Sequence, residues 1–192
     1  MADTTVVLVG TLDTKGREYA FLRDRLHAAG VGTILIDAGI MGPPLVEHDV
    51  TREEVAAAAG ADLEQLRAAG DRGQAVLAMA RGATAIVSGL YAEGRCHGVL
   101  AAGGSGNTSI AAEAMQALPV GVPKLIVSTI AAGDTRPIVG ASDLMPAMSS
   151  TGTLVMMPWL RSLDQHPATH LWTAYCSSFA AGQSPQRSRP RP

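Results

Sequence analysis

The sequence has few cysteines and few aromatic residues. Only Cys96 and Cys176 occur among its 192 residues, too few for a disulfide framework and too far apart for a CxxC metal or redox motif. Aromatic residues make up 4% of the chain and its formal net charge is −2, whereas nucleic-acid binders use a basic face or stacking aromatics. These absences predict a reducing, cytoplasmic setting and no nucleic-acid partner.

Long apolar runs are also missing from the sequence. Asp, Arg and Gly interrupt every candidate before it reaches the roughly 20 residues that cross a bilayer. The start, Met1-Ala2-Asp3, lacks the basic segment and cleavage site of a secretory signal peptide. We therefore expect a soluble protein with no membrane partner, whose 47% hydrophobic content suffices for a buried core.

Short apolar runs alternate with helical patterns along most of the chain. The runs at residues 5–10, 33–36, 98–102 and 124–128 predict buried strands of a parallel sheet, with right-handed crossovers between them. Thr51 and Glu54 have the spacing of a capping box, which predicts a helix start. A longer helix is predicted from about Gly73, and its Gly82 and Gly89 are expected to pack closely against neighbouring backbone.

The composition changes after about residue 150. Lys, Glu and Ile are absent from that point, and the chain ends in Ser-Pro-Gln-Arg-Ser-Arg-Pro-Arg-Pro. Such a mixture does not bury a core. We expect a domain over residues 1–150, followed by an atypical, disordered tail over residues 151–192.

A glycine-rich segment follows the predicted strand at 98–102. Its glycines allow close approach to an anion, and its amide groups lie where the next helix is expected to begin, which favours phosphate. Asn107 or Thr108 would fit a cap of that helix. A plain turn of this composition needs no ligand, and the pattern is neither a Walker loop nor GxGxxG, so cofactor identity stays open. The segment reads Gly103-Gly104-Ser105-Gly106-Asn107-Thr108.

Other candidate ligand-binding residues also follow predicted strands, where ligands of open α/β sheets bind. After the first strand, Lys15 would neutralise phosphate and Asp13 would hold magnesium through water. After the fourth, Asp134 would contact ribose or a metal and Arg136 would bind phosphate. Asp37, at the end of the second, has the position of a ribose-contacting acid. Each fits a solvated turn when taken alone, but together these loops are expected to meet at one sheet edge.

The sequence motifs together resemble one known family. Val-Gly-Thr-Leu-Asp-Thr-Lys-Gly at 9–16, Gly-Gly-Ser-Gly-Asn-Thr-Ser at 103–109 and Gly-Asp-Thr-Arg-Pro at 133–137 are similar to the ATP-binding domain of tomato mosaic virus resistance proteins and their bacterial relatives. The resemblance covers about residues 4–148. It implies a Rossmann-like α/β subdomain, an open parallel sheet flanked by helices in three layers, that binds ATP with magnesium and self-associates as a homo-oligomer.

The family pattern is lost after about Met148, where relatives continue into a further strand, helices and a second α/β subdomain. We interpret the tail as a frameshift product or a truncated reading frame. ATP binding is the leading functional hypothesis. A sugar-phosphate or organic-acid enzyme domain and a non-catalytic self-association module stay open as alternatives, and no pattern identifies catalytic or metal-ligating residues. The residues predicted to bind the cofactor are Gly10, Thr11, Asp13, Lys15, Asp37, Gly103, Gly104, Ser105, Gly106, Asn107, Thr108, Gly133, Asp134, Thr135 and Arg136.

Overall fold

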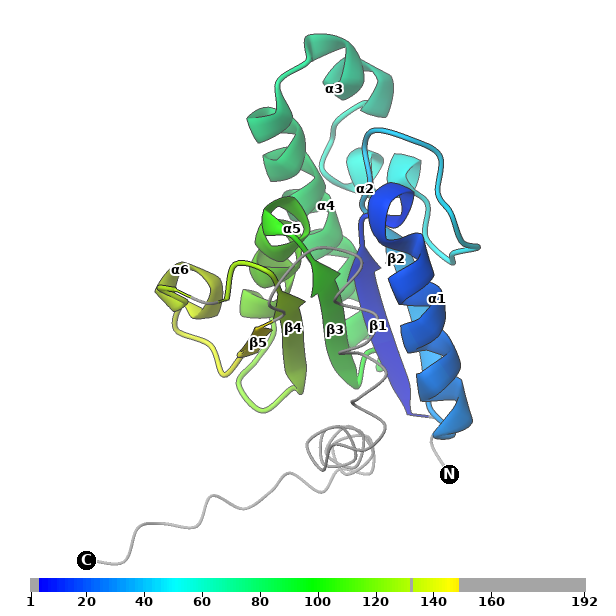
Figure 1. The fold of residues 1–192 in the computed structure, drawn as a ribbon, viewed down its shortest axis with the longest axis vertical. Coiled ribbons are helices and arrows are strands. Elements are labelled where there is room, and N and C mark those ends of the chain that lie inside the picture. Colours follow the sequence, from blue (N-terminus) through cyan, green and yellow to red (C-terminus); the bar gives the residue numbers. More distant parts are fainter. Residues whose placement is uncertain (1–3, 132, 149–192) are drawn as a thin grey trace, which may run out of the picture.

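Five parallel strands form a single sheet in the order β2-β1-β3-β4-β5 (Figure 1). The computed structural model describes residues 4–131 and 133–148. The disordered or frameshifted tail expected over residues 151–192, and the boundary near 150, lie outside the described residues. The strands are β1 Thr5–Gly10, β2 Gly32–Asp37, β3 Gly98–Gly103, β4 Lys124–Ser128 and β5 Met145–Met148.

Helices cover both faces of this sheet. Alternate strand residues point to opposite faces, so Val6 and Leu8 pack in the cluster that includes α1, while Val7 and Val9 pack with the other helices. This confirms the expected three-layer, Rossmann-like α/β fold. The helices are α1 Leu12–Ala28, α2 Arg52–Ala58, α3 Leu63–Ala69, α4 Arg72–Ala92, α5 Ser105–Gln116 and α6 Arg136–Val139.

The chain changes its direction of travel across the sheet between β1 and β3. From β1 the chain passes through α1 to β2 on one side, and from β3 it passes through α5 to β4 on the other. Leu8 of β1 is paired with both Leu35 and Leu100, so β1 lies between β2 and β3. The carboxyl ends of β1 and β3 therefore flank a topological switch point, where open α/β sheets bind ligands.

The predicted contact at Gly82 is present, and the one at Gly89 is not. A Cβ on Gly82 would lie 1.8 Å from the carbonyl oxygen of Val55, so only glycine lets α4 approach α2 this closely. A Cβ on Gly89 would meet nothing within 4 Å, and the expectation of close packing there is wrong. Gly82 thus fixes the α2–α4 crossing.

α4 also departs from the expectation that no apolar stretch is long enough to cross a bilayer. By length and composition it could cross a membrane, because Arg81 is the sole charged residue between Arg72 and its end. In the domain α4 packs against α5 and α2, and 44% of its 18-residue apolar segment is buried. This packing is that of a core helix.

The predicted capping box is confirmed at the start of α2. The Thr51 side chain accepts a hydrogen bond from the Glu54 N–H at 3.2 Å, and the Glu54 carboxylate accepts from the Thr51 N–H at 2.7 Å. The bonds from the Thr51 N–H and hydroxyl hold the pKa of Glu54 below its usual value. The sequence pattern thus placed this helix start correctly.

Candidate functional site

A cavity of about 570 Å³ opens at the switch point between β1 and β3. This volume lies in the range of small-molecule binding sites. Four segments line it: the start of α1, the loop after β2, the α3–α4 corner and the start of α5. The lining residues are 11, 13–15, 38, 40–41, 66–67, 70–72, 75–76, 104–107 and 110.

The start of α5 presents backbone N–H groups to this cavity. Gly104 is the N-cap in an extended conformation and makes no side-chain cap bond. The first N–H groups of a helix have no partner inside the helix, and within the described residues no hydrogen bond involves the N–H of Ser105, Gly106 or Asn107. The expectation that Asn107 or Thr108 caps the helix is wrong, because both lie inside its first turns.

The side chains of Asn107 and Thr108 hold α5 against the sheet. Asn107 is 4% exposed and its Nδ2 donates to the Ala102 carbonyl at 3.2 Å and to the Tyr19 hydroxyl at 3.0 Å. Thr108 Oγ1 lies 2.7 Å from Ser128 Oγ and 2.8 Å from the Gly104 carbonyl, and Thr108 does not line the cavity. These contacts fix the α5 start relative to β3 and β4.

Tyr19 connects β1 to this arrangement from the other face of the sheet. Its hydroxyl donates to the Val9 carbonyl and accepts from the Ala102 N–H at 2.8 Å. Complete burial raises the pKa of Tyr19 well above its ordinary value, so the phenol stays protonated. The hydroxyl thereby links β1, β3 and α5.

Gly10 and Gly103 pack beneath the cavity and do not line it. A Cβ on Gly10 would lie 2.4 Å from the Tyr19 ring, and one on Gly103 would lie 2.7 Å from the Asn107 Cβ. Both glycines were predicted to contact the cofactor. The structure shows a packing role for them, because their missing side chains make room for Tyr19 and Asn107, and the cofactor contact stays a prediction.

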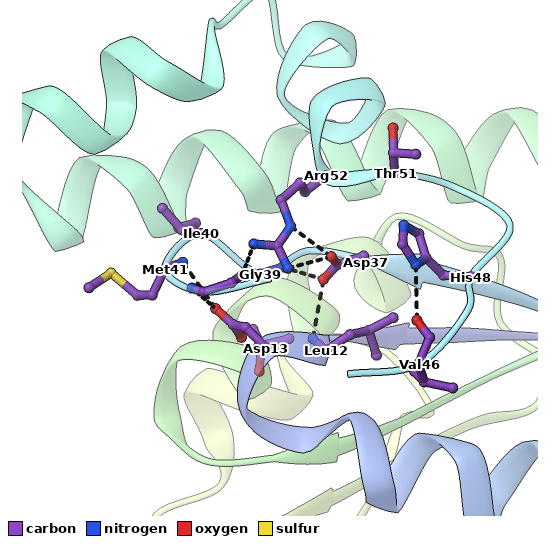
Figure 2. A network of polar contacts seen from close by, with 12 residues as sticks. Leu12, Asp13, Asp37, Gly39, Ile40, Met41, Val46, His48, Thr51 and Arg52 are labelled. Carbon is purple, nitrogen blue, oxygen red and sulfur yellow. Dashed lines mark hydrogen bonds and ion pairs between the residues drawn. The ribbon is translucent and has the colours of Figure 1, made fainter. Parts of the chain in front are cut away.

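The start of α1 supplies Thr11, Asp13 and Lys15 to the cavity. The helix begins at Leu12, so the loop predicted for residues 11–15 is largely its first turn. Asp13 Oδ2 accepts from the N–H group of Met41 at 3.0 Å (Figure 2) and from that of Gly42 at 3.3 Å. Asp13 Oδ1 is buried and has no hydrogen-bond partner among the described residues.

Lys15 is buried beside an acidic residue of its own helix. Its Nζ lies 3.3 Å from Glu18 Oε1, and the Glu18 side chain is 1% exposed. The charge that was predicted to neutralise phosphate is therefore already shared with a carboxylate, although Lys15 does line the cavity.

Asp37 lies in a buried ion pair instead of in the cavity. Its Oδ2 accepts from Arg52 Nε at 2.7 Å and lies 2.6 Å from Arg52 Nη2, while its Oδ1 accepts from the N–H groups of Leu12 and Gly39 (Figure 2). Asp37 is fully buried and does not line the cavity. Asp37 thus anchors the α1 start and the loop after β2, and the ribose contact stays a prediction.

The third predicted loop, residues 133–136, does not reach the cavity. Gly133, Asp134 and Arg136 are exposed, and none of the four residues lines the cavity. Arg136 Nη2 lies 2.7 Å from Asp134 Oδ2, and this contact holds the pKa of Asp134 below its usual value. The expectation that all the loops meet is corrected, because β4 lies one strand beyond the switch point and its loop turns toward α6.

The α3–α4 corner is the part of the cavity wall that no sequence motif indicated. Arg67 there donates to the Ile40 carbonyl at 2.6 Å and pairs with Glu64 at 2.5 Å. The side chain of Arg72, at the first position of α4, has neither an ion pair nor a hydrogen bond within the described part of the chain. The two N-cap aspartates, Asp62 and Asp71, are the sequence signals that would have placed these helix starts.

Comparison with known proteins identifies the family of this chain. Residues 4–163 match the N-terminal domain of UPF0261, described as an uncharacterised protein family. The chain belongs to this family. The resemblance stated from the motifs is thereby confirmed, and the matched range of this UPF0261 domain runs past the boundary predicted near residue 150.

The relatives are longer proteins. This UPF0261 domain is 45% identical over 139 residues to a UPF0261 protein of Clostridium tetani, which is 72% of the chain and 34% of that relative. It is 39% identical over 159 residues to one from Brucella suis, covering 82% of the chain and 38% of the relative. The ToMV susceptible protein tm-1(GCR26) of Solanum lycopersicum is 31% identical over 155 residues, 73% of the chain and 21% of that protein. The chain thus spans about a third of the bacterial relatives' length.

Proposed function

We propose that the cavity binds a nucleotide, ATP, with its phosphates at the start of α5. The observation that carries this proposal is the group of N–H donors at Ser105, Gly106 and Asn107, which opens onto a cavity of about 570 Å³ at the switch point. A helix start bears partial positive charge and unpaired donors, both of which favour a phosphate. Arg72 adds a full positive charge beside it.

Apolar side chains also line the cavity, and they suit a flat base. Ile40, Leu66, Val76 and Ile110 line it. Ligand sites typically combine apolar walls with a few convergent polar groups. A nucleotide has both parts, with an anionic phosphate chain at one end and a planar ring system at the other.

A magnesium ion carried by the nucleotide would fit Asp13. Within the described residues no group of three His, Cys, Asp or Glu side chains is placed to hold a metal. Nucleotide-bound magnesium needs only one or two protein carboxylates, since phosphates and water complete its shell. Asp13 Oδ1 is buried and has no hydrogen-bond partner among the described residues, and a rotation that turns it toward the cavity would let it hold such an ion, which would neutralise phosphate charge.

Calorimetric titration of the full chain with ATP, ribose 5-phosphate and inorganic phosphate, each with magnesium, tests the proposal. We expect saturable ATP binding at least about tenfold tighter than that of ribose 5-phosphate, because the base buries apolar surface. Equal affinities would support the sugar-phosphate alternative. If none of the three binds, the proposed function is wrong.

A further inference from the structure

Arg72 lies beside the start of α5 in the cavity wall. A Cβ placed on Gly106 would be 3.7 Å from Arg72 Nη2. The other cations that line the cavity already have acidic partners, since Lys15 pairs with Glu18 and Arg67 with Glu64. Arg72 has no such partner among the described residues. Its guanidinium is therefore the uncommitted positive charge of this wall.

Arg72 is exposed, and it lies beside the starts of two helices. Arg72 occupies the first position of α4, where the helix dipole is positive, and it faces the equally positive start of α5. The neighbouring Asp71 carboxylate is engaged as the α4 N-cap, accepting from the Gln74 N–H at 3.0 Å. The Asp71 charge offsets the dipole of α4, so the positive groups of this region without such a carboxylate cap are the Arg72 guanidinium and the start of α5, and both favour an anionic ligand.

A buried acceptor lies in the same wall. Asn107 is 4% exposed and lines the cavity, and its Oδ1 has no hydrogen-bond partner in the described part of the chain. Buried polar atoms are nearly always paired with protein, water or ligand. This oxygen has less than 1 Å² of accessible surface, so a ligand donor would reach it once the Asn107 side chain shifts toward the cavity.

We propose that Arg72 is a specificity-determining residue that selects a phosphoryl group over a carboxylate. This inference rests on the proposed function. Three N–H groups and the two-pronged guanidinium offer more donors than the two coplanar oxygens of a carboxylate accept, whereas the three terminal oxygens of a phosphoryl group match them. The second negative charge of the phosphoryl group also offsets the Arg72 guanidinium together with the positive start of α5.

The test compares AMP with adenosine 5′-carboxylate, which share a nucleoside and differ in their anionic group. ATP serves as the positive reference, and calorimetry of the full chain gives the affinities. We expect the unsubstituted chain to prefer AMP by at least about tenfold. In Arg72→Gln, AMP and ATP affinities should each fall about tenfold and the preference should largely disappear. Arg72→Lys keeps the positive charge but lacks the paired N–H donors of the guanidinium, and it should lose part of the preference for AMP.

Arg81→Gln is the matched control, because Arg81 is an exposed arginine of the same helix that does not line the cavity. Its affinities should equal those of the unsubstituted chain, and thermal unfolding should show all variants folded. An unchanged AMP preference in Arg72→Gln, or an equal loss in Arg81→Gln, overturns the role of Arg72 while ATP binding stands. If the unsubstituted chain binds neither ATP nor AMP, the proposed function itself fails, and the Arg72 inference fails with it.

Discussion

Two segments of this domain look alike in sequence and differ in the fold. Residues 104–107 and residues 133–136 each follow a strand and combine glycine with polar side chains. The first segment lines the cavity, whereas the second is largely exposed and lies outside it. The difference shows that the position of a strand in the sheet decides whether the loop after it meets the other loops.

The physical reason lies in the strand order. β1 and β3 are neighbours whose following helices cover opposite faces, so their carboxyl ends leave a crevice open between them. β4 lies on the far side of β3. Its following segment packs near the end of α5, where Gln116 donates to the Ile138 carbonyl at 2.7 Å.

The largest expected effect contrasts the two Asp–Arg pairs. Asp37→Asn would leave Arg52, which is 3% exposed, buried without a counter-charge, and should lower the free energy of unfolding by about 3–5 kcal/mol. Asp134→Asn breaks an exposed ion pair and should leave the free energy of unfolding without a measurable change. Urea denaturation followed by circular dichroism measures both. Equal losses in the two variants would contradict the assigned burial of the Asp37 pair.

A smaller effect is expected from the substitution of Gly10 by alanine. In Gly10→Ala the new Cβ would lie 2.4 Å from a Tyr19 ring that two strands hold in place, and overpacking of this kind costs about 1–3 kcal/mol. Gly133→Ala meets nothing within 4 Å and serves as the control. Thermal unfolding midpoints should fall for Gly10→Ala alone. An unshifted midpoint in Gly10→Ala would show that the hydrogen bonds to β1 and β3 do not hold the Tyr19 ring in place.

The smallest expected effect is a change in the pH dependence of stability, caused by Asp143, which precedes β5 and contacts Lys124 of β4. Burial alone would raise the pKa of Asp143, but hydrogen bonds from Lys124 at 2.6 Å and the Gly121 N–H at 2.6 Å outweigh it and lower the pKa. A lowered folded-state pKa stabilises the fold above the unfolded-state value, near 4, and this stability is lost as pH falls through the folded-state value. Stability should therefore fall more steeply below about pH 4 in the unsubstituted chain than in Asp143→Asn.

Denaturant midpoints measured over a pH series check this prediction. Parallel pH curves for the two proteins would contradict it. Because Asp143 lies away from the cavity, ATP affinity at neutral pH should be the same in both.

Much of the fold was predictable because its signals are local. Short apolar runs identified four strands, and the Thr51–Glu54 capping box located the start of α2. β5 was missed because Met-Pro-Ala-Met carries neither β-branched residues nor alternation, so it pairs with β4 through tertiary context alone.

The site was predictable only in part. The start of α5 and the start of α1 do line one cavity. This was expected because ligands of open α/β sheets bind at the carboxyl ends of the strands. The buried pair of Asp37 with Arg52 joins residues from separate elements, and no local pattern reveals it. Arg72 was missed for the same reason, because only the packing of α4 beside α5 brings its guanidinium near Gly106.

The central claim, that phosphate binds at the start of α5, is tested most directly by one pair of variants. Gly104→Asp would place a negative charge at that helix start, and its Cβ has room, with Thr129 Oγ1 at 3.8 Å as its nearest contact. Gly133→Asp adds the same charge where a Cβ meets nothing within 4 Å. ATP affinity measured by calorimetry should be lost in Gly104→Asp and kept in Gly133→Asp, with both variants folded. Unchanged ATP binding in a folded Gly104→Asp variant would contradict the account.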